Sequence, residues 1–587
     1  MAADVANVVE AEELSKIILV GHSFGAKVLI GCAWGTSERL VGKGGTAMKR
    51  NQANTLVQCM TFLVFFWAPV VGAQEKAGSA EKLGKVHFPV SCSAEVQTQF
   101  DRAVAMLYSF WYPQSLNAFT EVTKTDSSCA MGYWGIAMSL RGNPLVGSPD
   151  VSALKRGWEA VEKAKALGAQ TERERDYIAA MEAYYQNWEQ RDHRTRVLAY
   201  EEAMEQVYLR YPDDQEAAVV YALALNEAVT VLPADKTYAK PLRAAQILEK
   251  VLATQPDHPG ALHYLIHSYD FPRLAARGLP AAKHYAEVAP SAPHALHMPS
   301  HVFSMLGMWQ DSIRSNQAAL SVAKAYVHAM DFMVYAYLQG AQDREAKHIV
   351  EESDALQKPE IPSTEQTPTG GILAVYTAFA AIPARYAIER GAWAEAQALQ
   401  VRPTYPAADA ITYFTRALGA ARNGDVTSAR TNIEQLRALE EALAKSKDDY
   451  WAEQVRIQRL AAEAWVASAE GKKDDALKEM RAAADREDAC EKHVAMENRL
   501  WPMRELLGEL FLGLNDPAQA LKEFEASFQA APNRFRGFYG AAKAAERLGD
   551  QERARAYYEK LITLCSQADT ERPELTEAKA FLAKPSI

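Results

Sequence analysis

Two pairs of histidines give the chain its strongest chemical signal. His263 and His267 are four residues apart, as are His297 and His301, and this spacing puts both rings of a pair on one face of a helix. The first members of the two pairs differ by 34 in sequence number (297 − 263). If the chain repeats a helical unit of that length, stacking would bring the four imidazoles side by side on the inner wall of a superhelix.

Neutral imidazoles at this spacing can both bind one metal ion, and the second pair could complete or share the site. The next unit offers two further candidates, His328 and Asp331. The numbers of Asp331 and His297 differ by 34, whereas those of Gly340 and Gly307 differ by 33, so the register of Asp331 is open by one position. Four histidines with a carboxylate would suit Zn²⁺, Fe²⁺ or Mn²⁺.

Two other interpretations of the histidines remain open. They could form a polar ligand-binding column without metal, to which we also assign Tyr335, or they could be structural and pack beside tyrosines. Neither pair has a glutamate after its first histidine, so the metalloprotease pattern H-E-x-x-H is absent. Binding is therefore the first functional hypothesis, and a metal-dependent hydrolase or oxidoreductase using the same histidines is the alternative.

The elements that must position these side chains are helices. From about residue 95 onward, alanines stand at positions that permit close packing, and short breaks at Gly, Pro or Asp separate the helical runs. β-branched residues show almost none of the alternation that would indicate strands. The same breaks recur at Gly391, Gly424 and Gly471. Near the C-terminus a turn residue, an alanine and an aromatic recur with the same shift as the histidine pairs, as Asn515, Ala520 and Phe524 and then as Gly549, Ala554 and Tyr558.

This pattern resembles the tetratricopeptide (TPR) consensus. In such units the small turn residue lets two antiparallel helices meet, the alanine permits their close approach, and the aromatic fills the gap between units. The chain is also similar to exported bacterial TPR proteins with a Phe-Trp-Tyr block, here 110–112, a Tyr-Trp-Gly block, here 133–135, and paired histidines on consecutive helices. The resemblance implies an all-α solenoid whose concave face binds a protein, peptide or small-molecule ligand, and it implies no established reaction.

Proline-containing stretches mark the long loops between repeats. The longest and most polar is 358–371, which we take as the internal boundary. It separates an N-terminal TPR-like array over 95–357, with the histidines, from a C-terminal array over 372–587. This loop could form a flap over the inner surface or a solvated connection.

Residues 48–73 resemble a secretory signal peptide. Met48 opens a charged segment, a short apolar run follows, and small residues close it at Ala73. The run is short for a membrane span, and a buried helix is the alternative. Because a signal peptide works at the N-terminus, we expect translation to begin at Met48, which would make the protein periplasmic, with a linker over 74–94 and no stable membrane span. A start at Met1 would make it cytoplasmic.

Residues 1–47 are then an over-extended gene start or a fused fragment. Within them, 17–29 resemble the nucleophile elbow of an α/β-hydrolase, with Ser23 in Gly-His-Ser-Phe-Gly. That resemblance implies a serine hydrolase or esterase, which needs earlier parallel strands and later acid and histidine partners. Only sixteen residues precede Ile17 and helices follow, so this function is the most distant alternative.

Composition excludes other classes of partner. The net charge is −10 without a long basic run, so we expect neither nucleic acid nor an anionic membrane as partner. No phosphate-binding glycine loop or dinucleotide motif is present, so no nucleotide cofactor is expected. An exported chain could join Cys92 to Cys129, although the four cysteines that would survive cleavage allow three full pairings.

Overall fold

The computed structural model describes residues 81–356, 372–494, 496 and 499–584. The chain divides into the units Met1–Ala77 and Gly78–Ile587, and every described residue belongs to the second unit. Several predicted features lie outside the described residues, namely Ser23 with the segment 17–29, the signal-peptide-like segment 48–73, and the loop 358–371.

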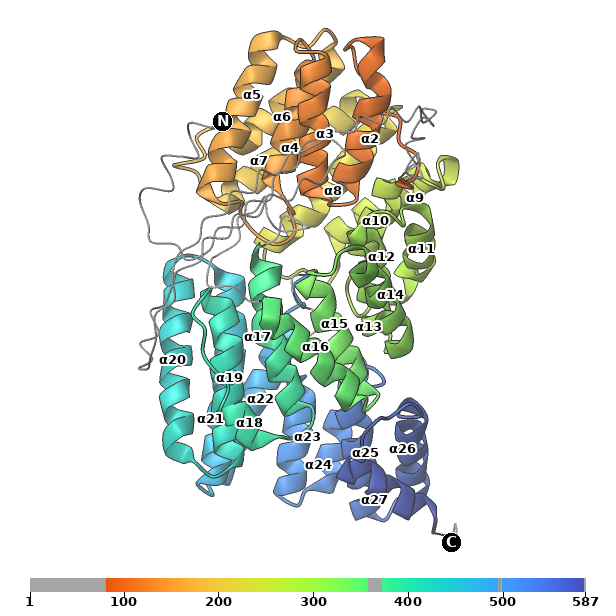
Figure 1. The fold of residues 1–587 in the computed structure, drawn as a ribbon. Helices are drawn as coiled ribbons and strands as arrows, with labels where there is room; N and C mark the ends of the chain where they lie inside the picture. Colours follow the sequence, from red (N-terminus) through yellow and green to blue (C-terminus); the bar gives the residue numbers. More distant parts are fainter. Residues whose placement is uncertain (1–80, 357–371, 495, 497–498, 585–587) are drawn as a thin grey trace, which may run out of the picture. The chain divides into compact units, whose positions relative to one another are not determined.

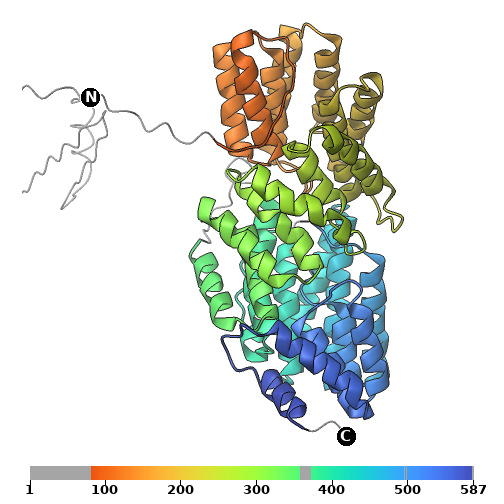
Figure 2. The same cartoon turned by 90° about the vertical axis from the view of Figure 1, so that its right-hand side faces the viewer.

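The described residues form an all-α solenoid, as the sequence predicts. Helices that follow one another in the chain lie side by side in both views, and no strand occurs in the described part (Figure 1, Figure 2). The first group comprises η1 (Ala94–Val96), α2 (Gln97–Tyr108), α3 (Tyr112–Thr125), α4 (Ala130–Arg141), α5 (Val151–Leu167), α6 (Glu172–Tyr185), α7 (His193–Arg210), α8 (Gln215–Val231) and α9 (Ala239–Thr254).

The middle of the chain has shorter helices, and it contains the histidine pairs. It comprises α10 (Pro259–Ser268), α11 (Ala275–Val288), α12 (Pro293–His297), α13 (Pro299–Met305), α14 (Trp309–Val322), α15 (Val327–Gln339) and α16 (Asp343–Leu356).

The C-terminal part returns to regular helix pairs. It comprises α17 (Ile372–Ile388), α18 (Trp393–Gln397), α19 (Pro406–Arg422), α20 (Val426–Lys445), α21 (Asp449–Ala469), α22 (Lys473–Ala489), α23 (Met503–Gly513), α24 (Pro517–Ser527), α25 (Phe535–Leu548), α26 (Gln551–Leu564) and α27 (Pro573–Leu582).

The turns between paired helices use the small residues that the sequence singles out. A left-handed backbone is needed to reverse the chain in so few residues, and glycine or asparagine adopts it at little cost. Aspartates then begin several of the following helices by accepting a backbone N–H, as Asp425 does for α20 and Asp550 for α26. The turn residues with positive φ include Gly307, Gly391, Gly424, Gly471, Asn515 and Gly549.

Close approach of the helices depends on small side chains opposite aromatic rings. Ala520 and Phe524 of α24 are fully buried, and Phe524 packs onto Gly540 of α25. A Cβ atom at position 540 would lie 2.2 Å from the Phe524 ring. The aromatic therefore packs between neighbouring units, as expected from the repeat.

Buried ion pairs also connect helices that are distant in the sequence. Arg534, immediately before α25, donates from Nη2 to Glu389 Oε1 at 2.7 Å and from Nε to Glu505 Oε1 at 2.8 Å. All three side chains are fully buried, and the one guanidinium is shared by two carboxyl groups, of which burial raises the pKa of Glu505 to about 7. Glu389 follows α17 and Glu505 lies in α23, so this contact joins three helix pairs.

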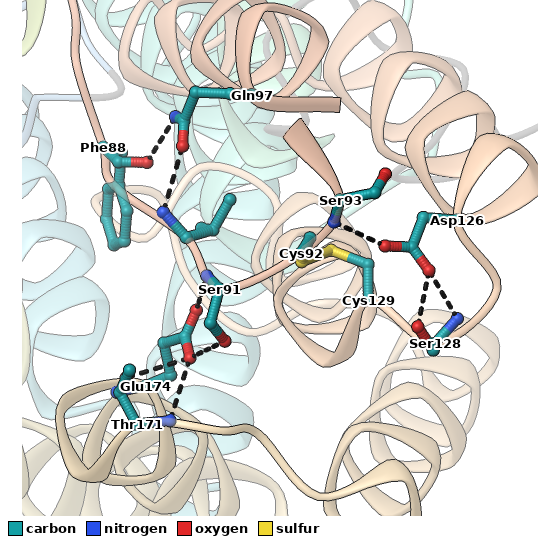
Figure 3. Close-up of a disulfide and its surroundings, with 11 residues drawn as sticks. Phe88, Ser91, Cys92, Ser93, Gln97, Asp126, Ser128, Cys129, Thr171 and Glu174 are labelled. Atoms are coloured by element: carbon teal, nitrogen blue, oxygen red, sulfur yellow. Dashed lines mark hydrogen bonds between the residues drawn. A yellow bond between two sulfur atoms is a disulfide. The ribbon is translucent and has the colours of Figure 1, made fainter. Parts of the chain in front are cut away.

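A disulfide attaches the extended N-terminal segment to the solenoid. Cys92 is bonded to Cys129, at the start of α4 (Figure 3). Nearby, the Ser91 N–H donates to Glu174 Oε1 at 2.6 Å, and Ser93 N–H donates to Asp126 Oδ2 at 2.8 Å. This pairing is one of those that the sequence left open. None of the described helices is both long and apolar enough to cross a membrane.

Candidate metal centre

Six buried histidines converge from four short helices. The histidines expected from the sequence lie on α10, α12 and α13, and His328 lies on α15. The structure adds His294, one turn before His297 on α12. The exposed fractions of all six side chains lie between 0% and 6%, and the six are His263, His267, His294, His297, His301 and His328.

The sequence had suggested one continuous helix for the second histidine pair. The structure has two short helices there instead. Pro299 has no backbone N–H, and α12 ends at His297 before α13 begins. Met298 between them keeps helical dihedral angles, with φ −52° and ψ −35°. The chain direction is therefore maintained, and His297 and His301 still face the same way.

The six side chains form two groups of three. In the first, Nε2 of His263 lies 3.0 Å from Nε2 of His267 and 3.0 Å from Nε2 of His294. We call this group site 1. The second group, site 2, contains His297, His301 and His328.

The ligand atoms of each site are close enough to share one ion. In site 2, the Nε2 atoms of His297 and His301 are 3.1 Å apart. Within each site the three candidate ligand atoms all lie within 4.8 Å of one another. Three imidazole nitrogens at such distances could hold a metal ion.

Site 2 repeats site 1 after one unit of the solenoid. His263 becomes His297 and His267 becomes His301. The third ligand, His294, becomes His328 with the same difference of 34 in sequence number. Each site therefore takes an i,i+4 pair from one unit and its third histidine from the next. The repeat-length difference between His294 and His328 is visible in the sequence, although the prediction omitted His294.

The two sites lie side by side, and rings of one site contact rings of the other. Ring centroids of His294 and His297 are 5.8 Å apart, and those of His267 and His301 are 5.9 Å apart. Phe110 packs against site 1, with its centroid 4.4 Å from that of His263. The aromatic block 110–112 of the sequence therefore contributes to the wall of the site.

Phe332 packs against site 2 as Phe110 packs against site 1, and its ring centroid lies 4.7 Å from that of His297. Phe110 has a left-handed backbone with φ 50°. Such a conformation is uncommon for a bulky residue. The two phenylalanines give the pair of sites an apolar surround.

Three of the rings have a hydrogen-bond acceptor next to Nδ1, on the side away from the other ligands. This acceptor determines which ring nitrogen carries the proton. His263 Nδ1 donates to the carbonyl oxygen of Tyr108 at 2.6 Å, and His297 Nδ1 donates to Asn316 Oδ1 at 2.6 Å. The Asn316 amide nitrogen itself donates to the Ser312 carbonyl, which orients Oδ1 toward the ring. With the proton on Nδ1, Nε2 carries an exposed lone pair, as in a metal-ligating histidine.

His301 has the same arrangement with a carboxylate. Its Nδ1 donates to Asp270 Oδ2 at 3.0 Å, while Lys492 Nζ lies 3.1 Å from Asp270 Oδ1. The Asp270 and Lys492 side chains are 4% and 3% exposed. Since the lysine neutralises the carboxylate, this buried pair adds no net charge beside site 2.

Burial also keeps the rings neutral. Loss of hydration disfavours the imidazolium, which lowers the pKa of His263 to about 3 and that of His297 to about 4. Burial lowers the pKa of His301 well below its ordinary value as well. Neutral imidazole is the form that binds metal.

Two residues assigned to the site from the sequence lie elsewhere. Asp331 belongs to neither histidine group, and its Oδ1 accepts from Nε of the fully buried Arg385 at 2.9 Å. A buried guanidinium needs an anionic partner, which explains why this carboxylate faces α17. Tyr335 accepts a hydrogen bond from Arg534, and its ring packs against Trp309 with centroids 5.2 Å apart.

Comparison with known proteins identifies no family for the chain. No family model and no curated protein matches it. A solved tetratricopeptide repeat protein from Parabacteroides merdae is 12% identical, over 60% of this chain and 100% of that one, with a TM-score of 0.23. The assignment of the fold therefore rests on the helices described above.

Proposed function

We propose that this protein is a metalloprotein in which each of the two tri-histidine sites holds one transition-metal ion. The observation that carries the proposal is the pair of facing nitrogens in site 2. His297 and His301 each donate from Nδ1 to an acceptor, so their Nε2 atoms, 3.1 Å apart, both present lone pairs. Two lone pairs at this distance repel unless a cation lies between them.

The environment favours a metal ion over a proton as that cation. A shared proton would create a buried imidazolium, which the apolar surround and the loss of hydration disfavour. A metal ion would instead be bound by three nitrogens in each site. His263, His297 and His301 are already held in orientation by outer hydrogen bonds at Nδ1, as is usual for metal-binding histidines.

The donor atoms narrow the choice of metal. With Asp331 bound to Arg385, neither histidine group contains a carboxylate. All-nitrogen sites suit zinc, copper, iron or nickel, whereas manganese prefers oxygen ligands. Three protein ligands also leave a coordination position open, as in catalytic sites, whereas structural zinc sites use four.

The disulfide supports the export that the sequence predicts. Disulfides persist in oxidising compartments and are rare in the cytosol, and Cys92 and Cys129 are paired. We therefore propose a periplasmic protein that binds metal and presents its concave surface to a protein, peptide or small-molecule ligand. A hydrolase or oxidoreductase reaction at the open positions remains the alternative.

Elemental analysis of the full chain tests metal binding. After purification without chelator in medium containing zinc, iron and copper, we expect about two metal ions per chain. The variant His263→Ala/His297→Ala removes one ligand from each site and should retain little metal. The control His284→Ala/His348→Ala changes two partly exposed histidines and should match the wild type. Absence of metal from the wild type, even after incubation with each ion, would overturn the proposal.

A further inference from the structure

We infer that the two sites act together as one dinuclear copper centre that binds dioxygen between its ions. The inference rests on the proposed function, because it requires a metal ion at each site. It adds the identity of the metal, the cooperation of the two ions and the class of the ligand. Three features of the described residues carry it: the spacing of the sites, their charge and their walls.

The spacing follows from α12, which contributes to both sites. His294 belongs to site 1 and His297 to site 2, and residues three apart on a helix are about 4.5 Å apart along its axis. They also lie on nearly the same face. Ring centroids of His294 and His297 are 5.8 Å apart, so two ions held by these rings would be close neighbours that a diatomic molecule could bridge.

The ring contacts between the sites support the same spacing. Centroids of His267 and His301 are 5.9 Å apart. Both pairs of rings that cross between the sites are thus in contact. The two ligand sets are therefore in direct contact, and the inference requires the open coordination positions of both ions to face one another.

Charge favours copper in its cuprous state. All six ligands are neutral imidazoles, and Lys492 already compensates Asp270, the carboxylate bonded to His301. Two divalent ions would place four uncompensated charges in a buried apolar site, whereas two cuprous ions would place two. Cu(I) also accepts three-coordinate nitrogen ligation without a fourth ligand, whereas Zn²⁺ normally completes a tetrahedron.

The walls favour a small, uncharged ligand. Phe110 stacks on His294 with centroids 5.3 Å apart, and Phe332 lies 4.8 Å from His301 and 5.1 Å from His328. These rings cover the imidazoles with apolar surface. Dioxygen is small and apolar enough to enter such a space, whereas a charged substrate would lose its hydration there.

The binding step is balanced by the two ions alone. Each Cu(I) gives one electron to O₂, so two Cu(I) become two Cu(II) and the dioxygen becomes a bound peroxide dianion. The O–O bond keeps its σ component, no proton is taken up, and each oxygen bonds to copper. Release of O₂ returns both electrons to the copper ions. One ion alone cannot supply both electrons, which is why the step needs both sites.

The test is anaerobic loading of the metal-free full chain with Cu(I), followed by exposure to O₂. We expect two copper ions per chain and uptake of one O₂ for every two coppers, measured with an oxygen electrode. A new near-ultraviolet charge-transfer band should appear. Electron paramagnetic resonance should show almost no Cu(II) signal, because two bridged cupric ions couple their spins.

Two variants separate the sites from the rest of the chain. His328→Ala removes one ligand from site 2 only and should bind copper at site 1 while losing stoichiometric O₂ uptake. His348→Ala changes a side chain that is 67% exposed on α16 and should behave as the wild type. Circular dichroism of each variant confirms that the helices remain folded.

The possible failures are distinguishable. If the wild type binds two zinc or iron ions but the copper-loaded protein takes up no O₂, the dicopper inference is overturned and the proposed metal binding stands. Isolated Cu(II) signals of full intensity after exposure to O₂ would also overturn the inference. Absence of every metal would overturn both proposals.

Discussion

At the scale of single residues, the metal centre depends on the groups behind its ligands. His297 is oriented by Asn316, whose side-chain oxygen accepts from Nδ1 at 2.6 Å. Asn316→Leu keeps the approximate shape and removes that acceptor, so the ring loses both its orientation and part of its basicity. We expect the affinity of site 2 for metal to fall by about 10- to 100-fold, measured by competition with a chromogenic chelator.

Asn432 provides a matched control for this substitution. It is a buried asparagine whose Oδ1 accepts from Arg416 and whose amide donates to the carbonyl four residues earlier, as Asn316 does within α14. Asn432→Leu should disturb α20 and leave the affinity of site 2 unchanged. Equal losses of affinity in both variants would contradict a specific role for Asn316.

The ligand set shows what residue patterns can and cannot predict. The i,i+4 spacing identified two pairs of neighbours, because the backbone is helical between the members of each pair even where α12 ends before α13. The third ligand of each site comes from the next unit. Its identification from the sequence requires the comparison of His294 with His328, whose numbers differ by one repeat length. The partner of Asp331 is 54 residues away, and no local pattern indicates that Arg385 holds this carboxylate.

At the scale of helices, glycine determines how closely two elements pack. Gly540→Ala would place a methyl group about 2.2 Å from the buried Phe524 ring. Overpacking of this kind lowers the free energy of unfolding by about 1–3 kcal/mol, which outweighs the better helix propensity of alanine. Urea unfolding followed by circular dichroism at 222 nm, a wavelength standard for helices, measures the loss.

Gly513 supplies the opposite case at the end of α23. A Cβ atom there would meet no atom within 4 Å, so Gly513→Ala adds helix propensity without a clash. We expect no loss of stability and a gain of up to about 1 kcal/mol. If Gly513→Ala were as destabilising as Gly540→Ala, close helix packing would not explain the cost of a methyl group at position 540.

The helix pairs were predictable because turn residues and caps are local signals. Positive φ at Gly424, Gly471 and Gly549 follows from the residue type that such turns require. The interruption at Pro299 also has a local cause, because proline has no backbone N–H. The left-handed backbone of Phe110 has no such local cause, since it is unusual for a bulky residue, and Phe110 adjoins site 1.

At the scale of the whole molecule, the disulfide relates stability to the compartment in which the chain works. Cys92 and Cys129 close a loop with a sequence separation of 37 residues. Removing such a cross-link frees the unfolded chain and lowers the free energy of unfolding by about 2–4 kcal/mol. Urea unfolding of Cys92→Ser/Cys129→Ser should show this loss, and reductant should have little further effect on that variant.

The control is Cys490→Ser, because Cys490 is a free thiol. This variant should remain as sensitive to reductant as the wild type and as stable in its absence. A wild type whose stability does not change on reduction would contradict the contribution of the disulfide. It would also remove one of the arguments for an oxidising compartment.

The histidine centre gives the metal-free molecule a pH dependence of known sign. The folded pKa values of His263 and His297, about 3 and about 4, lie below the ordinary value near 6.5 because burial disfavours the charged form. The unfolded chain therefore takes up protons below about pH 6.5 that the folded chain does not. Stability is fully present above that pH and is lost as the pH falls. The pKa values of the other four ligands are lowered in the same direction, namely His267, His294, His301 and His328.

Urea unfolding of the metal-free protein at pH 7.5 and 5.5 tests this dependence. Each neutral histidine contributes a loss of about 1.4 kcal/mol per pH unit below its unfolded pKa, so six together contribute up to about 8 kcal/mol at pH 5.5. His328→Gln removes one titrating ring and should reduce the loss by about 1.4 kcal/mol, whereas the exposed His348→Gln should not change it. Burial raises the pKa of Glu227 and Glu505 to about 7, so these two carboxyls take up protons in the fold over the same range and oppose part of the loss. The comparison of the two variants separates the histidine contribution, and an equal loss in His328→Gln and His348→Gln would contradict a neutral buried His328.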